Sequence, residues 1–154
     1  PTGNINFLQQ DNSFFCGYNT WATLLNRYYG SSPIIMKQTL ARENNTVDIE
    51  VYLCNMASKP LNTTLQIWLT EDGIVGKQIM PNGKTNNEYT HNHLLRASVL
   101  PSVWGESYQL PSIVPQTHHF SYTLPEKVVA ENCHIVSILS TNGIVIQATE
   151  TKIQ

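Results

Sequence analysis

The strongest constraint on this chain is a hydrophobic period of two that begins near residue 34 and recurs toward the C-terminus. In residues 47–53, Val47, Ile49, Val51 and Leu53 alternate with more polar side chains. The same alternation runs through residues 65–69. Successive side chains of a β-strand point to opposite faces, so the pattern predicts strands that bury one face and expose the other.

Turn residues separate about eight such segments, and Asn142-Gly143 is a strong signal for a two-residue hairpin. Little helical periodicity follows residue 30. The strands must therefore be largely antiparallel, because parallel crossovers need about a dozen residues or more. We predict a mainly β protein in which residues 31–154 form an antiparallel two-sheet β-sandwich. The predicted strands span residues 34–41, 47–53, 65–70, 74–79, 94–100, 118–124, 134–139 and 144–149.

Two segments lack the alternation and are predicted as loops. Residues 81–88 are polar and begin with Pro81-Asn82-Gly83. Residues 104–116 contain Pro111 and Pro115, which cannot donate a backbone hydrogen bond to a sheet. We expect the second segment to be an ordered surface loop.

The first thirty residues differ from the rest. Trp21, Leu24, Leu25, Tyr28 and Tyr29 recur at the spacing of one helix face, which predicts an amphipathic helix over residues 18–29. Residues 1–30 are therefore interpreted as a lead-in and helix that precede the sandwich.

Composition narrows the classes of partner. Only 13% of the 154 residues are charged and the formal net charge is -2, whereas Asn and Thr together occupy 30 positions. A nearly neutral surface argues against nucleic acid and against a polybasic membrane surface. No apolar run approaches the roughly 18 residues of a membrane span. The classes of partner that remain are neutral hydrogen-bonding ligands and other proteins.

The string His91-Asn92-His93 is the most conspicuous cluster of chemical groups. On a strand, His91 and His93 would point to one side and could bind a zinc-like ion. Candidate third ligands are Glu71, Asp72, His118 and His119. The alternatives are histidines that tie a loop to the sandwich by hydrogen bonds, and a nuclease motif, which the slightly acidic chain disfavours.

Two further motifs admit two interpretations each. Glu71-Asp72 precedes Gly73 and is either a turn or a carboxylate pair, although adjacent strand residues would diverge. Trp104-Gly105-Glu106 is a turn whose indole either plugs an end of the sandwich or stacks on a ligand.

Three cysteines, Cys16, Cys54 and Cys133, are too few and too far apart for a disulfide scaffold. They are either buried thiols, one pair with an odd thiol, or a reactive thiol.

The order of these motifs resembles a known family, the 28-kilodalton outer-membrane proteins of Bacteroidetes-type bacteria, which are envelope lipoproteins. The resemblance rests on Thr70 to Val75 with Gln78, on Tyr89 to Ala97, on Trp104-Gly105-Glu106, and on two strings near the end, Glu131 to Val136 and Val145 to Ala148. It covers the chain from about residue 20 onward.

In that family a thioredoxin-like region typically precedes a β-sandwich. The resemblance implies that Pro1-Thr2-Gly3 is the tail of such a region and that this chain is a C-terminal fragment. It also implies export to the periplasm, outer membrane or cell surface. Membrane association would come only through a lipid anchor on an upstream cysteine. The family implies no catalytic residues and no cofactor.

These observations lead to one main hypothesis and two alternatives. The main hypothesis is a non-catalytic envelope module that binds a peptide, a glycan or a partner protein. The alternatives are a metal-dependent hydrolase using His91 and His93, and an auxiliary domain of a thiol–disulfide protein. The predicted binding surface gathers Glu71, Asp72, His91, Asn92, His93, Arg96, Trp104 and Glu106.

Overall fold

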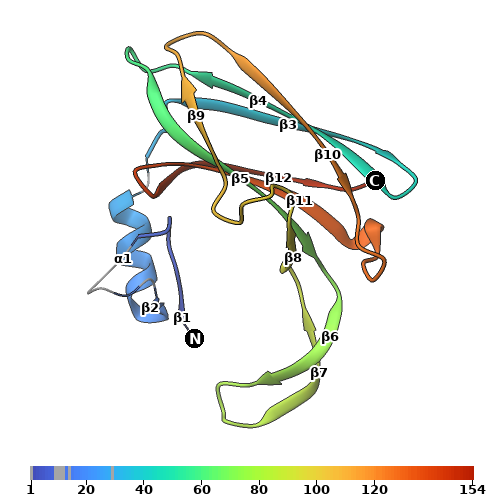
Figure 1. Cartoon of the computed structure of the whole chain (residues 1–154). Helices are drawn as coiled ribbons and strands as arrows, with labels where there is room; N and C mark the ends of the chain where they lie inside the picture. Colours follow the sequence, from blue (N-terminus) through green and yellow to red (C-terminus); the bar gives the residue numbers. More distant parts are fainter. Residues whose placement is uncertain (1, 9–12, 14, 29) are drawn as a thin grey trace.

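The computed structural model describes residues 2–8, 13, 15–28 and 30–154 and confirms a mainly β, antiparallel protein with one α-helix (Figure 1). In chain order its elements are β1 Thr2–Gly3, β2 Cys16–Gly17, α1 Tyr18–Tyr28, β3 Ile34–Glu43, β4 Thr46–Asn55, β5 Leu61–Glu71, β6 Ile74–Ile79, β7 Thr85–His91, β8 Leu94–Ser98, β9 Glu106–Leu110, β10 Gln116–Thr123, the 3-10 helix η1 Ala130–Asn132, β11 Cys133–Thr141 and β12 Ile144–Lys152.

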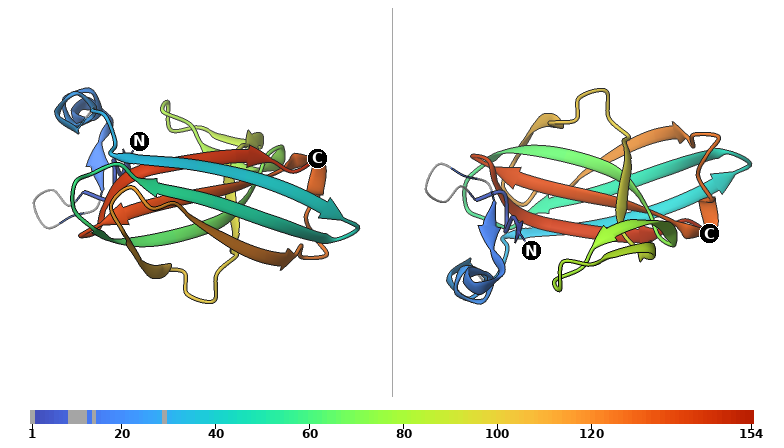
Figure 2. Two further views of the ribbon diagram at one scale, coloured as in Figure 1. Left: turned by 90° about the horizontal axis from the view of Figure 1, so that it is seen from above. Right: turned by 90° about the horizontal axis from the view of Figure 1, so that it is seen from below.

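Two sheets face each other across the core (Figures 1 and 2). One has the strand order β10-β4-β3. The other has the order β12-β11-β5-β8, with β9 also pairing with β5. The alternating residues predicted to be buried are buried: Val47, Ile49, Val51 and Leu53 of β4 are at most 1% exposed, as are Leu65, Ile67 and Leu69 of β5.

The simple sandwich of two sheets and about eight strands is incomplete in three respects. Residues 104–116 are not one loop, because Glu106–Leu110 forms β9 and pairs with residues 61–65 of β5. The polar segment 81–88 ends in β7, which pairs with β6. Two additional two-stranded sheets, β1-β2 and β6-β7, lie outside the sandwich.

The hairpin of β6 and β7, here called the arm, projects from the sandwich (Figure 1). Most of its side chains are exposed, including Val75 and Ile79. A hairpin without a packed face needs few apolar residues, so β7 lacks the alternation by which a strand is found in a sequence.

The N-terminal segment packs on the outer face of the larger sheet (Figure 1). The Phe7 ring lies 6.0 Å from the ring of Trp68, and the Val145 amide donates to the Asn6 carbonyl at 3.1 Å. In α1, Leu24 is buried but Leu25 is 56% exposed, so the apolar face is narrower than predicted. The side chain of Tyr28 and all of Tyr29 lie outside the described residues.

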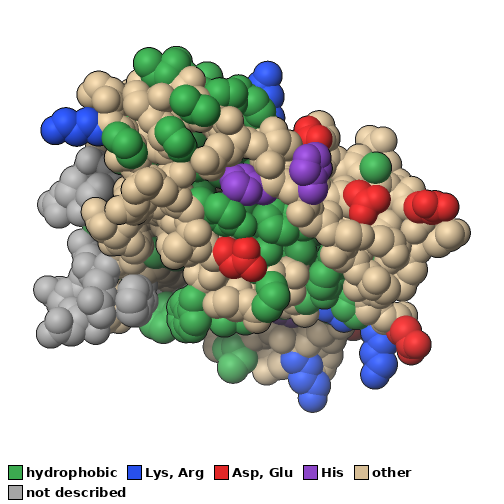
Figure 3. Space-filling view, turned by 45° about the horizontal axis from the view of Figure 1, so that its top comes forward, with side chains coloured by type: hydrophobic (Ala, Val, Ile, Leu, Met, Phe, Trp, Pro, Cys, Tyr) green, Lys and Arg blue, Asp and Glu red, His purple; other side chains and the backbone are tan. Residues whose placement is uncertain are grey.

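The described part of the chain contains no helix that is long and apolar enough to cross a membrane. Charged side chains occupy a small part of the face seen in Figure 3, as the low charge content predicts. Cys16, Cys54 and Cys133 are free thiols, so no pair forms between them.

Candidate functional site

β5 leads into β6 through Asp72 and Gly73, and β7 leads into β8 through Asn92 and His93. These four residues lie between the strand pairs β5-β8 and β6-β7, and we call them the elbow. Gly73 and His93 both adopt left-handed backbone angles, with φ of 76° and 54°. Two reciprocal hydrogen bonds close the elbow. The His93 amide donates to Asp72 Oδ1 at 2.7 Å, and the Gly73 amide donates to Asn92 Oδ1 at 3.0 Å.

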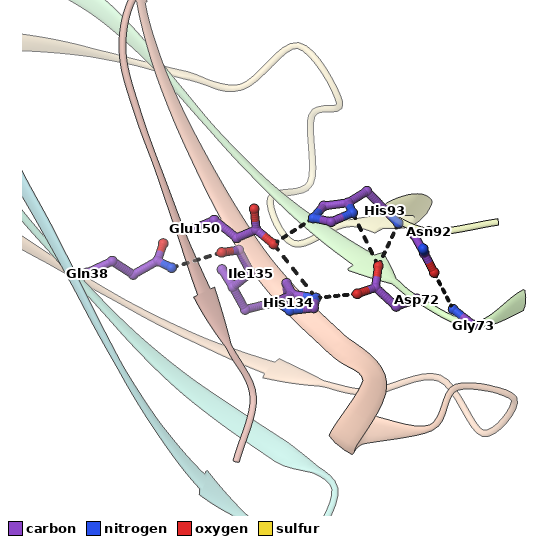
Figure 4. A network of polar contacts seen from close by, with 8 residues as sticks. All are labelled: Gln38, Asp72, Gly73, Asn92, His93, His134, Ile135 and Glu150. Carbon is purple, nitrogen blue, oxygen red and sulfur yellow. Dashed lines mark hydrogen bonds and ion pairs between the residues drawn. The ribbon is translucent and has the colours of Figure 1, made fainter. Parts of the chain in front are cut away.

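His93 folds back from the elbow onto the sandwich (Figure 4). Its Nδ1 lies 3.3 Å from Asp72 Oδ1 and its Nε2 lies 3.2 Å from Glu150 Oε1. Its ring stacks on His134 with a centroid distance of 5.6 Å and an interplanar angle of 11°. We call Asp72, His93, His134 and Glu150 the histidine cluster.

The structure does not bring His91 and His93 together as ligands of one metal ion. His91 ends β7 and packs edge-on against Tyr89 on the arm, whereas His93 lies beyond the strand in a left-handed conformation. The lone pairs of stacked, nearly parallel rings lie in parallel planes, so His93 and His134 cannot converge on one ion. Among the described residues, no three or more His, Cys, Asp or Glu side chains are placed to hold a metal ion.

The predicted third ligands His118 and His119 lie on β10, in the opposite sheet. His118 packs against Tyr108 at 4.2 Å between ring centroids, and its burial lowers its pKa below the usual value. His119 is exposed, 3.8 Å from Glu50. Neither ring lies beside His93, because β10 belongs to the opposite sheet.

Glu71 and Asp72 diverge, as adjacent strand residues should. Asp72 lies at the surface, whereas Glu71 is 1% exposed and is held from two sides. The Val129 amide donates to its Oε1 at 2.8 Å, and the Arg96 guanidinium forms an ion pair with its Oε2. Glu71 is therefore part of the core boundary and does not face a ligand.

A β-bulge aims Arg96 at this carboxylate. Ala97 is paired with Leu69 and Leu95 with Thr70, so Arg96 is the extra residue on β8. A bulge of this kind redirects one side chain without ending the strand pair.

A groove of about 830 Å³ lies on the outer face of the larger sheet. Its mostly apolar lining comes from the N-terminal segment, β5, β8, the loop after β8 and the β11–β12 hairpin. The lining residues are Asn4, Phe7, Thr64, Gln66, Trp68, Leu95, Arg96, Ala97, Ser98, Val103, Trp104, Ser140 and Gly143.

Trp104 stands at this groove and is 82% exposed, so its indole does not plug the sandwich. Its loop is nevertheless held. Gln66 Nε2 donates to the Val103 carbonyl at 3.1 Å, and Gly105, with φ 87°, lies so close to β5 that an added Cβ would be 2.3 Å from the Leu65 carbonyl oxygen. The exposed indole is thus presented on a fixed backbone.

The groove also reaches a sheet edge. Four consecutive residues of β8, Leu95 to Ser98, line it. The β-bulge at Arg96 interrupts the alternation of side chains here, and the four residues place β8 along one side of the groove. Within the described residues β8 pairs only with β5, and its other edge has no partner strand.

The predicted site residues therefore lie in separate places. Glu106 is paired with Leu65 and receives a hydrogen bond from the Tyr108 hydroxyl at 2.9 Å, on the core side of the sheet. Six positions along β5 separate Leu65 from Glu71, which is about 20 Å. Asp72, Asn92 and His93 meet at the elbow, Arg96 and Trp104 line the groove, and His91 lies on the arm.

Sequence reasoning missed several residues of both sites. Trp68 and Gln66 alternate with the buried residues of a predicted strand, so they were expected on its outer face. That position could have marked them as groove residues. His134 and Glu150 reach His93 only through the registers of β11 and β12, which the sequence alone does not reveal.

Comparison with known proteins identifies the family. The profile of the outer membrane protein Omp28 family matches residues 18–154. No curated protein matches. Among solved structures, a domain of the outer membrane lipoprotein Omp28 from Porphyromonas gingivalis is 18% identical with a TM-score of 0.57, and covers 82% of this chain and 93% of that one.

Two further structures share the fold. HBP35 of Porphyromonas gingivalis is 14% identical with a TM-score of 0.66, over 88% of this chain and 45% of that one. Spo0M, a sporulation control protein from Bacillus subtilis, is 12% identical with a TM-score of 0.52, over 81% and 49%. This chain thus spans about half the length of either protein. The family match confirms the resemblance inferred from the motifs: the chain belongs to the outer membrane protein Omp28 family and is a module of the outer membrane or cell envelope.

Proposed function

We propose that this chain is a non-catalytic binding module of the envelope that takes up an extended segment of a partner protein along the open edge of β8. The observation that carries the proposal is an aromatic groove beside β8, one edge of which pairs with no strand in the described part of the chain. An added strand would gain main-chain hydrogen bonds from the edge, and its alternate side chains would enter the groove.

The chemistry of the groove favours a peptide over a glycan. Leu95, Val103 and Phe7 are simple apolar groups, and Trp68 and Trp104 are the residue type most enriched among binding hot spots. Gln66, Ser98 and Ser140 can fix polar groups without adding charge. The groove volume of about 830 Å³ suits a few anchoring side chains of a longer segment.

Membrane association would come from outside this module. We propose that it is carried by a lipid anchor on a longer protein, as in the lipoprotein relative. A preceding thioredoxin-like region remains a prediction of the resemblance, and so does the boundary near residue 30.

Selection from a phage-displayed library of random 12-residue peptides tests the proposed function. We expect enriched peptides with apolar residues at alternate positions that bind the wild type but not Trp104→Ala. Val114→Ala removes an exposed apolar side chain outside the groove and should bind like the wild type.

The same proteins are applied to a glycan array. The proposal is contradicted if no peptide is enriched, if enriched peptides bind Trp104→Ala equally well, or if Trp104-dependent binding is found for glycans alone.

A further inference from the structure

The elbow fixes the direction in which the arm leaves the sandwich. The backbone takes left-handed angles on both strands of the elbow, at Gly73 and His93. Two contacts tie the elbow to the rest of the sandwich: the Asp72 amide donates to the Asn132 carbonyl at 2.9 Å, and the His93 side chain reaches Glu150 at 3.2 Å (Figure 4). Glu150 and His134 belong to β12 and β11, so His93 joins the base of the arm to the far strands of the sheet.

The histidine cluster is complementary to a protonated imidazole. Both ring nitrogens of His93 face carboxylate oxygens, at 3.3 and 3.2 Å. A neutral imidazole donates from one nitrogen only, whereas an imidazolium donates from both.

The ring of His134 lies beside the same two carboxylates. His134 Nδ1 is buried and makes no hydrogen bond to any described residue, and it lies 3.9 Å from Asp72 Oδ2 and 3.8 Å from Glu150 Oε1. Two carboxylates this close to one nitrogen repel each other unless a cation lies between them. Lys152, opposite His134 on β12, also attracts Asp72 and is the other cation that acts on the cluster.

We propose that His93 is a pH-sensitive pin: charged, it holds the arm bent against the sandwich through Asp72 and Glu150, and uncharged, it releases the elbow. His93 directly precedes β8, so release would free the end of the strand edge at Leu94 and Leu95. This consequence for ligand access rests on the proposed function, whereas the pin itself does not.

The pH range follows from the groups involved. An imidazole carries its charge in mild acid and not in mild base, so the two conditions compared are one of each. The hydrogen bond from the His93 amide is the main cause of the lowered pKa of Asp72, and the histidines and Lys152 add to it. Asp72 therefore keeps its charge into mild acid, and the pin is lost again only when the pH falls through that lowered pKa.

Hydrogen exchange of the arm amides, normalised to intrinsic rates and measured near pH 5.5 and near pH 8, tests the proposal. Wild-type protection of residues 74–91 should be about two- to fivefold higher at the lower pH, the range for a partly exposed ion pair. His93→Asn, which tolerates the left-handed backbone, should show the lower protection at both values.

Glu150→Gln should reduce the difference independently of the elbow backbone, and it keeps the test usable if His93→Asn folds poorly. His119→Gln changes an exposed histidine of the opposite sheet and should leave the wild-type difference intact. Equal wild-type protection at both pH values, or a full pH response in both His93→Asn and Glu150→Gln, would overturn the proposal. No peptide is used, so failed peptide binding leaves this result unaffected.

Discussion

At the residue scale, Arg96 lines the groove and forms an ion pair with Glu71, which is buried beneath it. Both residues belong to the binding surface predicted from the sequence. The alternation in β5 already assigned Glu71 to the same face as Leu69, which is the core face. The β-bulge that brings Arg96 to it has no sequence signal, since it depends on the pairing register.

We predict that Arg96→Met lowers the free energy of unfolding by about 3 kcal/mol, because the buried Glu71 carboxylate loses its charged partner. Arg42→Met is the matched control: its partner Glu131 is 68% exposed, so the loss should stay below about 1 kcal/mol. Urea unfolding measures both. Similar losses in the two variants would contradict the interpretation of Glu71.

Cys133 carries the second prediction at this scale. Burial, with the Glu71 carboxylate adding to it, raises the pKa of its thiol to about 11. The folded protein therefore holds this proton more tightly than the unfolded chain does. The resulting stabilisation is complete below the ordinary thiol pKa and is lost as the pH rises through about 11.

We expect the urea midpoint of the wild type to fall at alkaline pH and the fall to be smaller in Cys133→Ala. In the native protein at neutral pH, a thiol reagent should modify the half-buried Cys16 before Cys133. Rapid native-state labelling of Cys133 would show that the thiol is accessible and would refute this account.

At the element scale, the success of sequence reasoning depends on whether a strand has one buried face. The segments around Ile49 and Ile67 have one buried face, and the alternation of apolar and polar residues was sufficient to predict them as strands. β7 has none, because it belongs to the projecting arm. β9 was missed for another reason, since the prolines at 111 and 115 made the whole segment look like a loop. The strand ends before these prolines, and its five residues, Glu106 to Leu110, pair with the start of β5.

Gly105 is the element-scale position on which the Trp104 loop depends. Gly105→Ala would place a Cβ 2.3 Å from the Leu65 carbonyl oxygen at φ 87°, so we predict a loss of about 3 kcal/mol or more. Gly83→Ala has a similar φ of 77° with no atom within 4 Å and should lose about 1–2 kcal/mol. Equal losses of stability on thermal unfolding would show that the close approach of Gly105 to β5 does not matter for folding.

At the scale of the whole molecule, the groove exists because distant parts of the chain meet on one sheet face. The N-terminal segment supplies Phe7, β5 supplies Trp68, and the loop after β8 supplies Trp104. Each residue was visible in the sequence, but their meeting depends on strand order. The single surface predicted from the sequence is therefore not formed. Arg96 and Trp104 line the groove, Asp72 and His93 belong to the histidine cluster, and the other predicted residues lie elsewhere.

The most direct test of the central claim is calorimetric titration of wild-type, Trp104→Ala and Val114→Ala proteins with one peptide selected on the wild type. Loss of a central aromatic contact should weaken binding of the Trp104 variant at least about tenfold. The Val114 variant should stay within a factor of about two. Equal affinity of all three proteins for that peptide would contradict the assignment of the groove as the binding site.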